Sequence, residues 1–172
     1  DISTYLKSLE MEITISLVSK LQIARVSQLT QKTNQFNLTT KRYTEADIEN
    51  FMNNGDFVFY LSLNDKFGDY GVTGVCIVTF DEGTATIDSL ILSCRILGRN
   101  VEYIFLHKIL DYLKKLGHNK IKAQYRKTSK NEQVNDFYPQ LSFNLVSHIE
   151  KEFNYLLETV VCTNSNSNSN SK

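Results

Sequence analysis

The residues best suited to chemistry lie together at positions 92–100, where a strand-like run ends and an amphipathic helix is expected to begin. Arg95 and Arg99 bring positive charge to this junction, and Gly98 lets a ligand approach the backbone closely. The first N–H groups of a helix bind phosphate or pyrophosphate. Cys94 lies just before this expected anion site. An anion site beside a thiol is what the handling of a pantetheine thioester requires.

Two interpretations of Cys94 are open. Its thiolate could accept an acyl group and pass it to a second thiol, because exchange of one thioester for another changes the bond energy little. The neighbouring arginines and the helix N-terminus would favour that thiolate. Alternatively, Cys94 is a small buried strand residue, as free cysteines commonly are. Cys76 and Cys162 are expected to be structural.

Charge and composition argue against several classes of protein. Lysine and arginine together number 19, and aspartate and glutamate also number 19, so a nucleic-acid or membrane-surface partner is not expected. No apolar run approaches the roughly 20 residues of a membrane helix. The three cysteines lack metal-site spacing, which favours reduced thiols in a cytoplasmic protein without a metal. Residues 1–162 should form one domain, followed by a disordered Asn/Ser tail at 163–172.

Hydrophobic periodicity and turn residues predict the elements that must position these groups. In chain order they are a strand at 11–15, helices at 17–31 and 44–53, strands at 56–63, 71–80 and 84–93, a helix at 101–116, a strand at 118–125, a helix over 129–137, and strands at 143–149 and 153–161. Capping boxes are expected at Thr44–Asp47 and Ser129–Glu132. Tyr138 should leave helical geometry because Pro139 follows it. The compact solution is an α/β domain with one mixed, mostly antiparallel sheet and helices on both faces.

This order of elements, with an Arg-x-x-Gly turn after the strand 84–93, resembles the GNAT acyltransferase superfamily. In that fold the pantetheine arm of the acyl donor lies between two diverging strands, which correspond here to 84–93 and 118–125. The resemblance implies that four residues hold the phosphate end of the donor, although the last of them stands where a small residue is usual. They are Arg95, Gly98, Arg99 and Asn100.

A second part of the chain, Asn131 together with 137–143, resembles another motif of the same superfamily. In that motif the Asn contacts the pantetheine arm and a Tyr protonates the departing thiolate, which implies these roles for Asn131 and Tyr138. Pro139 and Ser142 depart from the pattern. A tyrosine ring that only packs beneath a helix is the alternative for Tyr138.

The runs 28–40, 65–69 and 92–95 resemble the C-terminal part of FkbH-like proteins, which join a HAD-type phosphatase-like domain to a GNAT-like domain. The family is associated with loading a glyceryl unit onto an acyl carrier protein. The resemblance therefore implies the phosphopantetheine of such a carrier, or CoA, as the acyl carrier. HAD chemistry begins at an Asp-x-Asp motif, which is absent from this sequence. A HAD-like partner domain is accordingly expected outside this chain, on its N-terminal side.

The loop at 32–41 is dense in amides and hydroxyls that could bind the hydroxyl groups of a small acyl unit. The residues proposed for this contact are Thr33, Asn34, Gln35 and Asn37. Such side chains could equally bond the backbone of their own loop. Asp88, on the expected strand 84–93, could act as a base through water or be structural.

Basic residues crowd the end of the helix 101–116 and the segments after it, and these could dock the acidic surface of a carrier protein or be scattered over a solvated surface. They are Lys114, Lys115, Lys120, Lys122, Arg126, Lys127 and Lys130. The sequence thus predicts an acyltransferase domain that moves a small, hydroxylated, glyceryl-like acyl group between pantetheine thioesters. Two alternatives are a non-catalytic module that binds a carrier protein and a CoA-dependent N-acetyltransferase.

Overall fold

The computed structural model of the 172-residue chain describes residues 10–93 and 100–159. Four predicted site residues, Cys94, Arg95, Gly98 and Arg99, lie outside the described residues. The predicted tail at 163–172 lies outside them as well.

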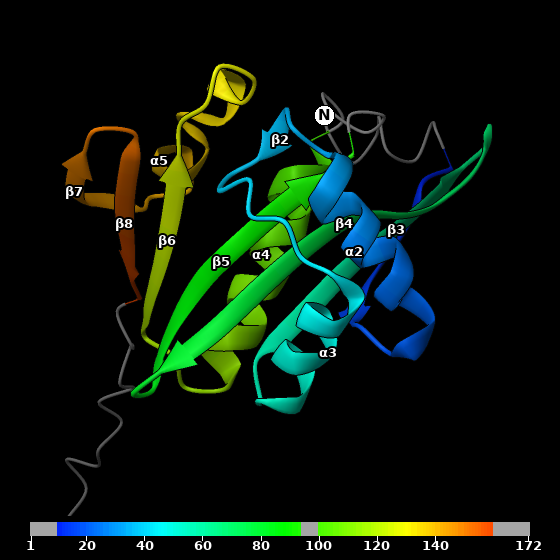
Figure 1. Ribbon diagram of the computed structural model, residues 1–172, viewed down its shortest axis with the longest axis horizontal. Helices are drawn as coiled ribbons and strands as arrows, with labels where there is room; N and C mark the ends of the chain where they lie inside the picture. The colour runs from blue at the N-terminus through cyan, green and yellow to red at the C-terminus, as the bar shows by residue number, and fades with distance from the viewer. Residues whose placement is uncertain (1–9, 94–99, 160–172) are drawn as a thin grey trace, which may run out of the picture.

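Eight strands form one mixed sheet, shown in Figure 1. They are β1 (Glu12–Leu17), β2 (Phe36–Asn37), β3 (Phe57–Asp65), β4 (Gly68–Asp81), β5 (Thr84–Leu92), β6 (Lys120–Arg126), β7 (Asn144–Ile149) and β8 (Glu152–Glu158). Along the sheet the order is β1-β3-β4-β5-β6-β8-β7, and β2 pairs with β5. Only β5 and β6 run parallel, and all the other pairs of described strands are antiparallel. The predicted mixed, mostly antiparallel sheet is confirmed.

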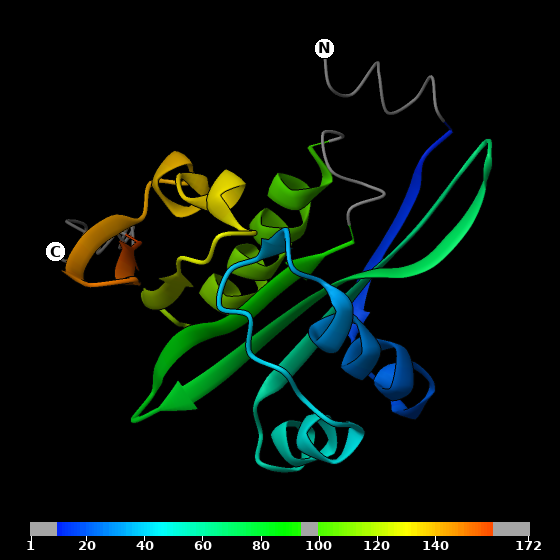
Figure 2. The same cartoon turned by 45° about the horizontal axis from the view of Figure 1, so that its top comes forward.

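Helices cover both faces of this sheet, as predicted. They are the 3-10 turns η1 (Lys20–Gln22) and η3 (Glu132–Val134) and the helices α2 (Ile23–Lys32), α3 (Glu45–Asn53), α4 (Val101–Lys115) and α5 (Phe137–Gln140). α2 and α3 lie over β3 and β4 on one face, and α4 crosses the opposite face behind β5 (Figures 1 and 2). Each face therefore has its own buried core, with Val26, Ile48 and Val75 in one and Phe105 and Leu90 in the other.

Strand β6 shows how this layering orients side chains. Ile121, Ala123 and Tyr125 are buried in the core on the α4 side. The alternating residues Gln124 and Arg126 are exposed on the opposite face. In the part of the chain that the structure describes, no helix lies over β6 and β8 on that opposite face (Figure 1).

The two predicted capping boxes have different outcomes. The box at α3 is confirmed, because the Asp47 N–H donates to Thr44 Oγ1 (3.1 Å) and the Thr44 N–H donates to Asp47 Oδ2 (2.9 Å). The box at Ser129 is wrong. There, the Thr128 N–H donates to Asn131 Oδ1 (2.7 Å), and only the short turn η3 follows.

The prediction that Tyr138 leaves helical geometry is also wrong, because α5 contains both Tyr138 and Pro139. Pro139 lies within the first turn of this four-residue helix, where the N–H that proline lacks has no intrahelical partner to lose. The restriction on the residue before proline is a preference, and here the packing of the Tyr138 ring overrides it.

Candidate functional site

The parallel strands β5 and β6 stay together for only three residue pairs and then part. The pairs are Ala85–Ile121, Thr86–Lys122 and Ile87–Ala123. Beyond Ile87, the edge of β5 that faces β6 is open to another partner. This parting of two parallel strands is the feature that the GNAT resemblance implied between 84–93 and 118–125.

The chain itself bridges the space between the parted strands with residues 36–39, which we call the strap. Phe36 pairs with Leu92 and Asn37 with Ile91 in an antiparallel ladder. The ladder continues at Leu38, whose N–H donates to the carbonyl oxygen of Leu90 (3.1 Å). On the other side, the Arg126 N–H donates to the carbonyl oxygen of Leu38 (2.8 Å). The strap therefore joins the parted ends of β5 and β6.

The predicted substrate-binding residues lie at the entry to this strap, and the side-chain hydrogen bonds of Asn34 and Asn37 join residues between positions 33 and 42. The Thr33 carbonyl oxygen accepts from Asn37 Nδ2 (3.1 Å) and Arg42 Nη1 (2.9 Å). Asn37 is fully buried, and its Oδ1 accepts from the Thr40 N–H (2.9 Å). Asn34 Oδ1 accepts from Arg42 Nη2. Gln35 is exposed. The loop supports its own backbone with these groups, and their contact with a substrate stays a prediction.

Asn131 is buried with 0 % of its surface exposed. Its Nδ2 donates to the carbonyl oxygens of Asn37 and Arg126, both at 2.9 Å. Its Oδ1 accepts from the Thr128 N–H (2.7 Å) and lies 3.5 Å from the Tyr125 hydroxyl. In this conformation the amide fastens the strap to the end of β6. Its predicted contact with a pantetheine arm stays a prediction.

Tyr138 lies beside the point where the strands part. Its ring packs against the ring of Tyr155 at a centroid distance of 5.7 Å. Tyr155 on β8 pairs with Ala123 on β6, and Ala123 belongs to the last pair between β5 and β6. The side chain is 1 % exposed, and its hydroxyl makes no hydrogen bond to any residue in the described ranges. Burial raises the pKa of Tyr138 well above its ordinary value, with smaller contributions from Cys76 and Asp88. The hydroxyl is therefore protonated and available as a donor.

Asp88, midway along β5, is held by three donors. Lys41 Nζ donates to Oδ1 (2.8 Å), whereas the Tyr43 hydroxyl (2.6 Å) and Ser89 Oγ (2.9 Å) donate to Oδ2. Burial, together with the hydrogen bond to this carboxylate and its charge, raises the pKa of Tyr43. The arrangement ties the loop after the strap to β5. No motif could have identified it, because Tyr43 and Asp88 are 45 positions apart.

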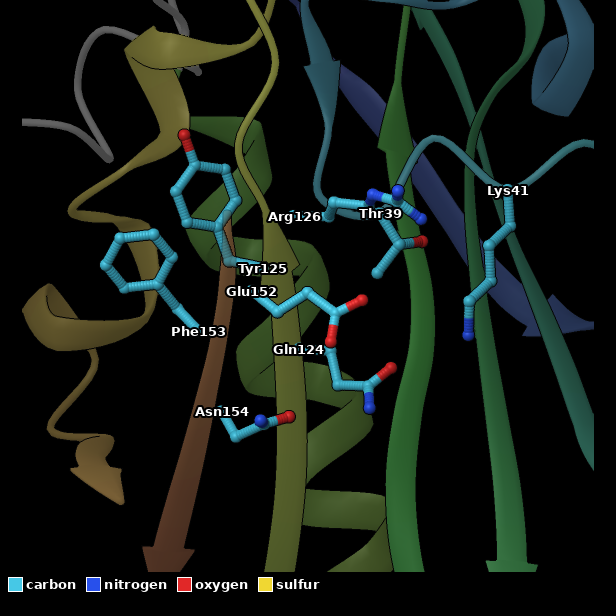
Figure 3. Close-up of a pocket in the computed structure, with 8 residues that line it drawn as sticks. All are labelled: Thr39, Lys41, Gln124, Tyr125, Arg126, Glu152, Phe153 and Asn154. Atoms are coloured by element: carbon cyan, nitrogen blue, oxygen red, sulfur yellow. The ribbon is translucent and has the colours of Figure 1, made fainter. Parts of the chain in front are cut away.

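A cavity of about 60 Å³ opens on the sheet face that α4 does not cover, between β6, β8 and the loop after β2 (Figure 3). Its lining residues are Thr39, Lys41, Gln124, Tyr125, Arg126, Glu152, Phe153 and Asn154. A hollow of about 340 Å³ shares Gln124 and Asn154 with it and extends across β8 toward Val146. The lining of the smaller cavity combines two amides, a threonine hydroxyl, two cations, one carboxylate and two aromatic residues, a composition that suits a small polar ligand.

The basic residues divide between the two faces. Lys120, Lys122 and Arg126 alternate on the exposed side of β6, next to the cavity. Lys114 and Lys115 lie in the last turn of α4, on the opposite face. Lys127 lies 3.8 Å from Glu132 in an ion pair. Only part of the predicted basic set therefore shares one surface.

Asn100, the last of the predicted phosphate-binding residues, precedes α4 with a left-handed backbone (φ +60°). Asparagine tolerates this conformation better than most side chains. Its side chain does not cap the helix. Within the described ranges, no group of three or more His, Cys, Asp or Glu residues could hold a metal ion, and no helix is long and apolar enough to cross a membrane.

The fold defines the class of protein: a domain with the architecture of the GNAT acetyltransferases. No family model and no curated protein sequence matches the chain. Among solved structures, it resembles the ribosomal-protein-S18-alanine N-acetyltransferase of Escherichia coli, with a TM-score of 0.67, 15 % identity, and coverage of 86 % of this chain and 94 % of that one.

Two further neighbours carry the coenzyme. The PaiA N-acetyltransferase of Thermoplasma acidophilum, in complex with coenzyme A, has a TM-score of 0.61 and 15 % identity over 86 % of this chain and 99 % of that one. The putative acetyltransferase yncA of Salmonella typhimurium, with acetyl-CoA, has a TM-score of 0.60 and 15 % identity over 85 % and 93 %. These identities establish the fold alone.

Proposed function

We propose that this domain transfers an acyl group from a pantetheine thioester whose arm lies between the parted strands β5 and β6. The observation that carries the proposal is the buried Tyr138 hydroxyl beside that parting, which has no acceptor in the described ranges. A buried hydroxyl without a partner destabilises a protein by about 1–3 kcal/mol. The sulfur of a bound thioester would supply the missing acceptor.

In the proposed reaction, an acceptor nucleophile attacks the thioester carbonyl and the carbon–sulfur bond breaks. The electron pair leaves with sulfur, and the Tyr138 hydroxyl gives its proton to the departing thiolate. The acceptor's own proton then restores the tyrosine through water. General acid catalysis of this kind contributes roughly 10²–10⁴-fold in rate.

The acyl end of the donor would lie toward the cavity on the open sheet face. Gln124 and Asn154 offer amide groups to hydroxyls there, Glu152 offers a carboxylate that accepts from them, and Arg126 offers positive charge. This lining supports a small, hydroxylated acyl group such as a glyceryl unit. The donor's phosphate would lie at the N-terminus of α4, which Asn100 leaves uncapped. The roles of Arg95, Gly98, Arg99 and the relay thiol Cys94 are part of the same proposal.

The carrier would be an acyl carrier protein or CoA. The row Lys120, Lys122 and Arg126 on β6 would face an acidic carrier surface. The HAD-like domain expected on the N-terminal side would supply the phosphate chemistry, as the FkbH-like resemblance implies. In that arrangement, acyl transfer is the only step that this domain performs.

A CoA-dependent N-acetyltransferase is the second candidate, because the named structural neighbours are acetyltransferases. The two functions differ in the acceptor. Wild-type protein and Tyr138→Phe would be mixed with acetyl-CoA or a glyceryl thioester, and with either an acyl carrier protein or a primary amine. Mass spectrometry would identify the acylated product. Acylation of the carrier alone supports the first function, and acylation of the amine alone supports the second.

A non-catalytic, carrier-binding module would bind the carrier protein with neither product formed. In that case, substitution of Tyr138 would leave binding unchanged. Equal transfer rates for the wild type and Tyr138→Phe would contradict the proposed acid.

A further inference from the structure

We propose that the strap, residues 36–39, is a removable occupant of the donor site: it fills the free edge of β5 in the unliganded protein and leaves when the donor's arm binds. This inference rests on the proposed function, from which it takes the position of the arm between β5 and β6.

The strap occupies the edge of β5 as an added strand would. Its ladder covers Leu90 to Leu92, beyond the last residue that pairs with β6. Thr39 Oγ1 extends the contact by donating to the carbonyl oxygen of Asp88 (3.0 Å). A pantetheine arm carries two amides and would use the same backbone donors and acceptors of β5. The strap and the arm therefore cannot both pair with this edge.

The strap also blocks the approach to Tyr138. Leu38 is fully buried in the core on the α4 side, and Phe36 is nearly so. The Phe36 ring meets the Phe137 ring edge-on at a centroid distance of 5.2 Å, and Phe137 contacts Tyr138 in turn (5.7 Å). Withdrawal of these two apolar side chains would open a channel of matching apolar character toward the Tyr138 hydroxyl.

Backbone strain at the end of the strap favours its release. Thr40, which follows it, has a left-handed backbone (φ +55°), a conformation that strains a β-branched residue. The hydrogen bond from the Thr40 N–H to Asn37 Oδ1 stabilises this strained conformation. On the far side, Asn131 and the Arg126 N–H hold the strap by single bonds to the carbonyls of Asn37 and Leu38. Departure of the strap relieves the strain at Thr40 and exposes the bonding groups of both strands together.

A reversible crosslink tests the competition directly. Asn37 and Ile91 are direct partners that neighbour the hydrogen-bonded pair Leu38–Leu90. They therefore form a non-hydrogen-bonded pair, whose Cα atoms lie about 4.5 Å apart, within the range that a disulfide spans. Asn37→Cys with Ile91→Cys would be prepared in a Cys94→Ser, Cys162→Ser background. CoA binding would be measured by calorimetry on the oxidised and the reduced protein.

Oxidation is expected to weaken CoA binding by tenfold or more, and reduction of the same sample to restore it, so that each molecule is its own control. Thermal unfolding of both forms verifies that the oxidised protein is folded. Equal CoA affinity in a folded oxidised form and the reduced form would overturn the strap proposal while leaving the proposed function intact.

Two single substitutions should shift the equilibrium between the docked and the withdrawn strap in opposite directions. Thr39→Val removes the hydroxyl that bonds the Asp88 carbonyl and is expected to tighten CoA binding by about fivefold, the equivalent of one hydrogen bond. Thr40→Gly suits the left-handed backbone, stabilises the docked strap and is expected to weaken CoA binding. The same direction of change in both variants would contradict competition.

Hydrogen exchange on the wild type provides a readout that needs no variant. The Leu38 amide, bonded to Leu90, is expected to exchange faster when CoA is added, although ligands ordinarily slow exchange. CoA binding with an unchanged Leu38 amide would overturn the strap alone. If neither the wild type nor Thr39→Val binds CoA or an acyl-pantetheine, the proposed function fails, and the strap proposal with it.

Discussion

Replacement of Tyr138 by Phe should make the free protein more stable and the enzyme slower. The hydroxyl is buried and makes no hydrogen bond within the described parts of the chain. Its removal relieves a desolvation penalty of about 1–3 kcal/mol, because phenylalanine fills the same space without a polar atom. The ring contacts with Phe143 and Tyr155 remain. We expect the free energy of unfolding to rise by about 1 kcal/mol, which corresponds to roughly 2–4 °C in Tm for a domain of this size.

The rate should change in the opposite direction. Loss of a general acid slows acyl transfer by roughly 10²–10⁴-fold. Urea denaturation gives the stability, and single-turnover transfer from an acyl thioester gives the rate. Tyr155→Phe is the matched control, since it removes a phenolic hydroxyl from a ring that contacts Tyr138. We expect it to alter the transfer rate little.

The combination of signs distinguishes the proposal from a merely structural tyrosine. A tyrosine held by an internal bond would lose stability on conversion to phenylalanine. A drop in unfolding free energy of more than 1 kcal/mol, or an unchanged transfer rate, would refute the reasoning. Because burial raises the pKa of Tyr138, the acid should stay protonated at every pH below its ordinary value of 10.0, and its ionisation should not limit the rate there.

Three further predictions concern the framework of the site. Because the pKa of Tyr43 is raised in the folded state, the stability that it contributes is complete below its unfolded pKa of 10.0 and is lost as pH rises above that value. Tyr43→Phe should lower the free energy of unfolding by about 1–2 kcal/mol at pH 7, because the hydrogen bond to Asp88 is lost. In urea titrations from pH 7 to 11, the variant should also lack part of the alkaline loss of stability. Asn131→Asp should destabilise the fold by about 2–4 kcal/mol in the same assay, because the carbonyls of Asn37 and Arg126 lose their donor. A smaller effect than that of Tyr43→Phe would contradict the role of Asn131 in fastening the strap to β6. Gly74→Ala should lower Tm by several degrees in calorimetry, because the added Cβ would lie 2.8 Å from Leu92 Cδ2 and destabilise the fold by about 1–3 kcal/mol. An unchanged Tm would show that Leu92 can move aside.

Elements whose signals lie within a few residues were predicted well. The capping box of α3 involves only Thr44 and Asp47, and both side chains bond as the spacing indicates. The hairpin between β4 and β5 turns at Asp81–Gly83, where Gly83 has the positive φ that favours glycine. The apolar spacing of α4 also places its buried residues, including Phe105 and Ile109, against the sheet.

The failed local predictions lie where distant residues compete for the same groups. Asn131 sits inside the expected capping box at Ser129, but its amide serves the carbonyl of Asn37, 94 positions earlier in the chain. Tyr138 stays helical before Pro139 because its ring is packed among Phe143 and Tyr155. In both cases, the free energy of buried contacts exceeds a local preference of about 1 kcal/mol.

The candidate site was predicted in part. The resemblance to the GNAT superfamily implied that the strands 84–93 and 118–125 part, as they do, whereas the roles of the predicted site residues, Tyr138 and Cys94 among them, stay predictions. The amide-rich loop was noted for its polar groups, but not for the apolar side chains of Phe36 and Leu38, which place it within the sheet. The signal was available, because Phe36 and Leu38 alternate with Asn37 as residues of a short strand do.

The sequence alone determined the order of the main strands and helices, the two-sided layering of helices on the sheet and the α/β class of fold, because periodicity and turn chemistry depend on near neighbours. It missed β2, and it predicted one helix where the structure has η3 and α5. Only the tertiary structure decided that the strap fills the edge of β5, that Asp88 is held by Lys41 and Tyr43, and that the Tyr138 hydroxyl is buried beside the parted strands. These features depend on which distant segments of the chain come together, and burial strengthens the polar contacts that are shielded from water there.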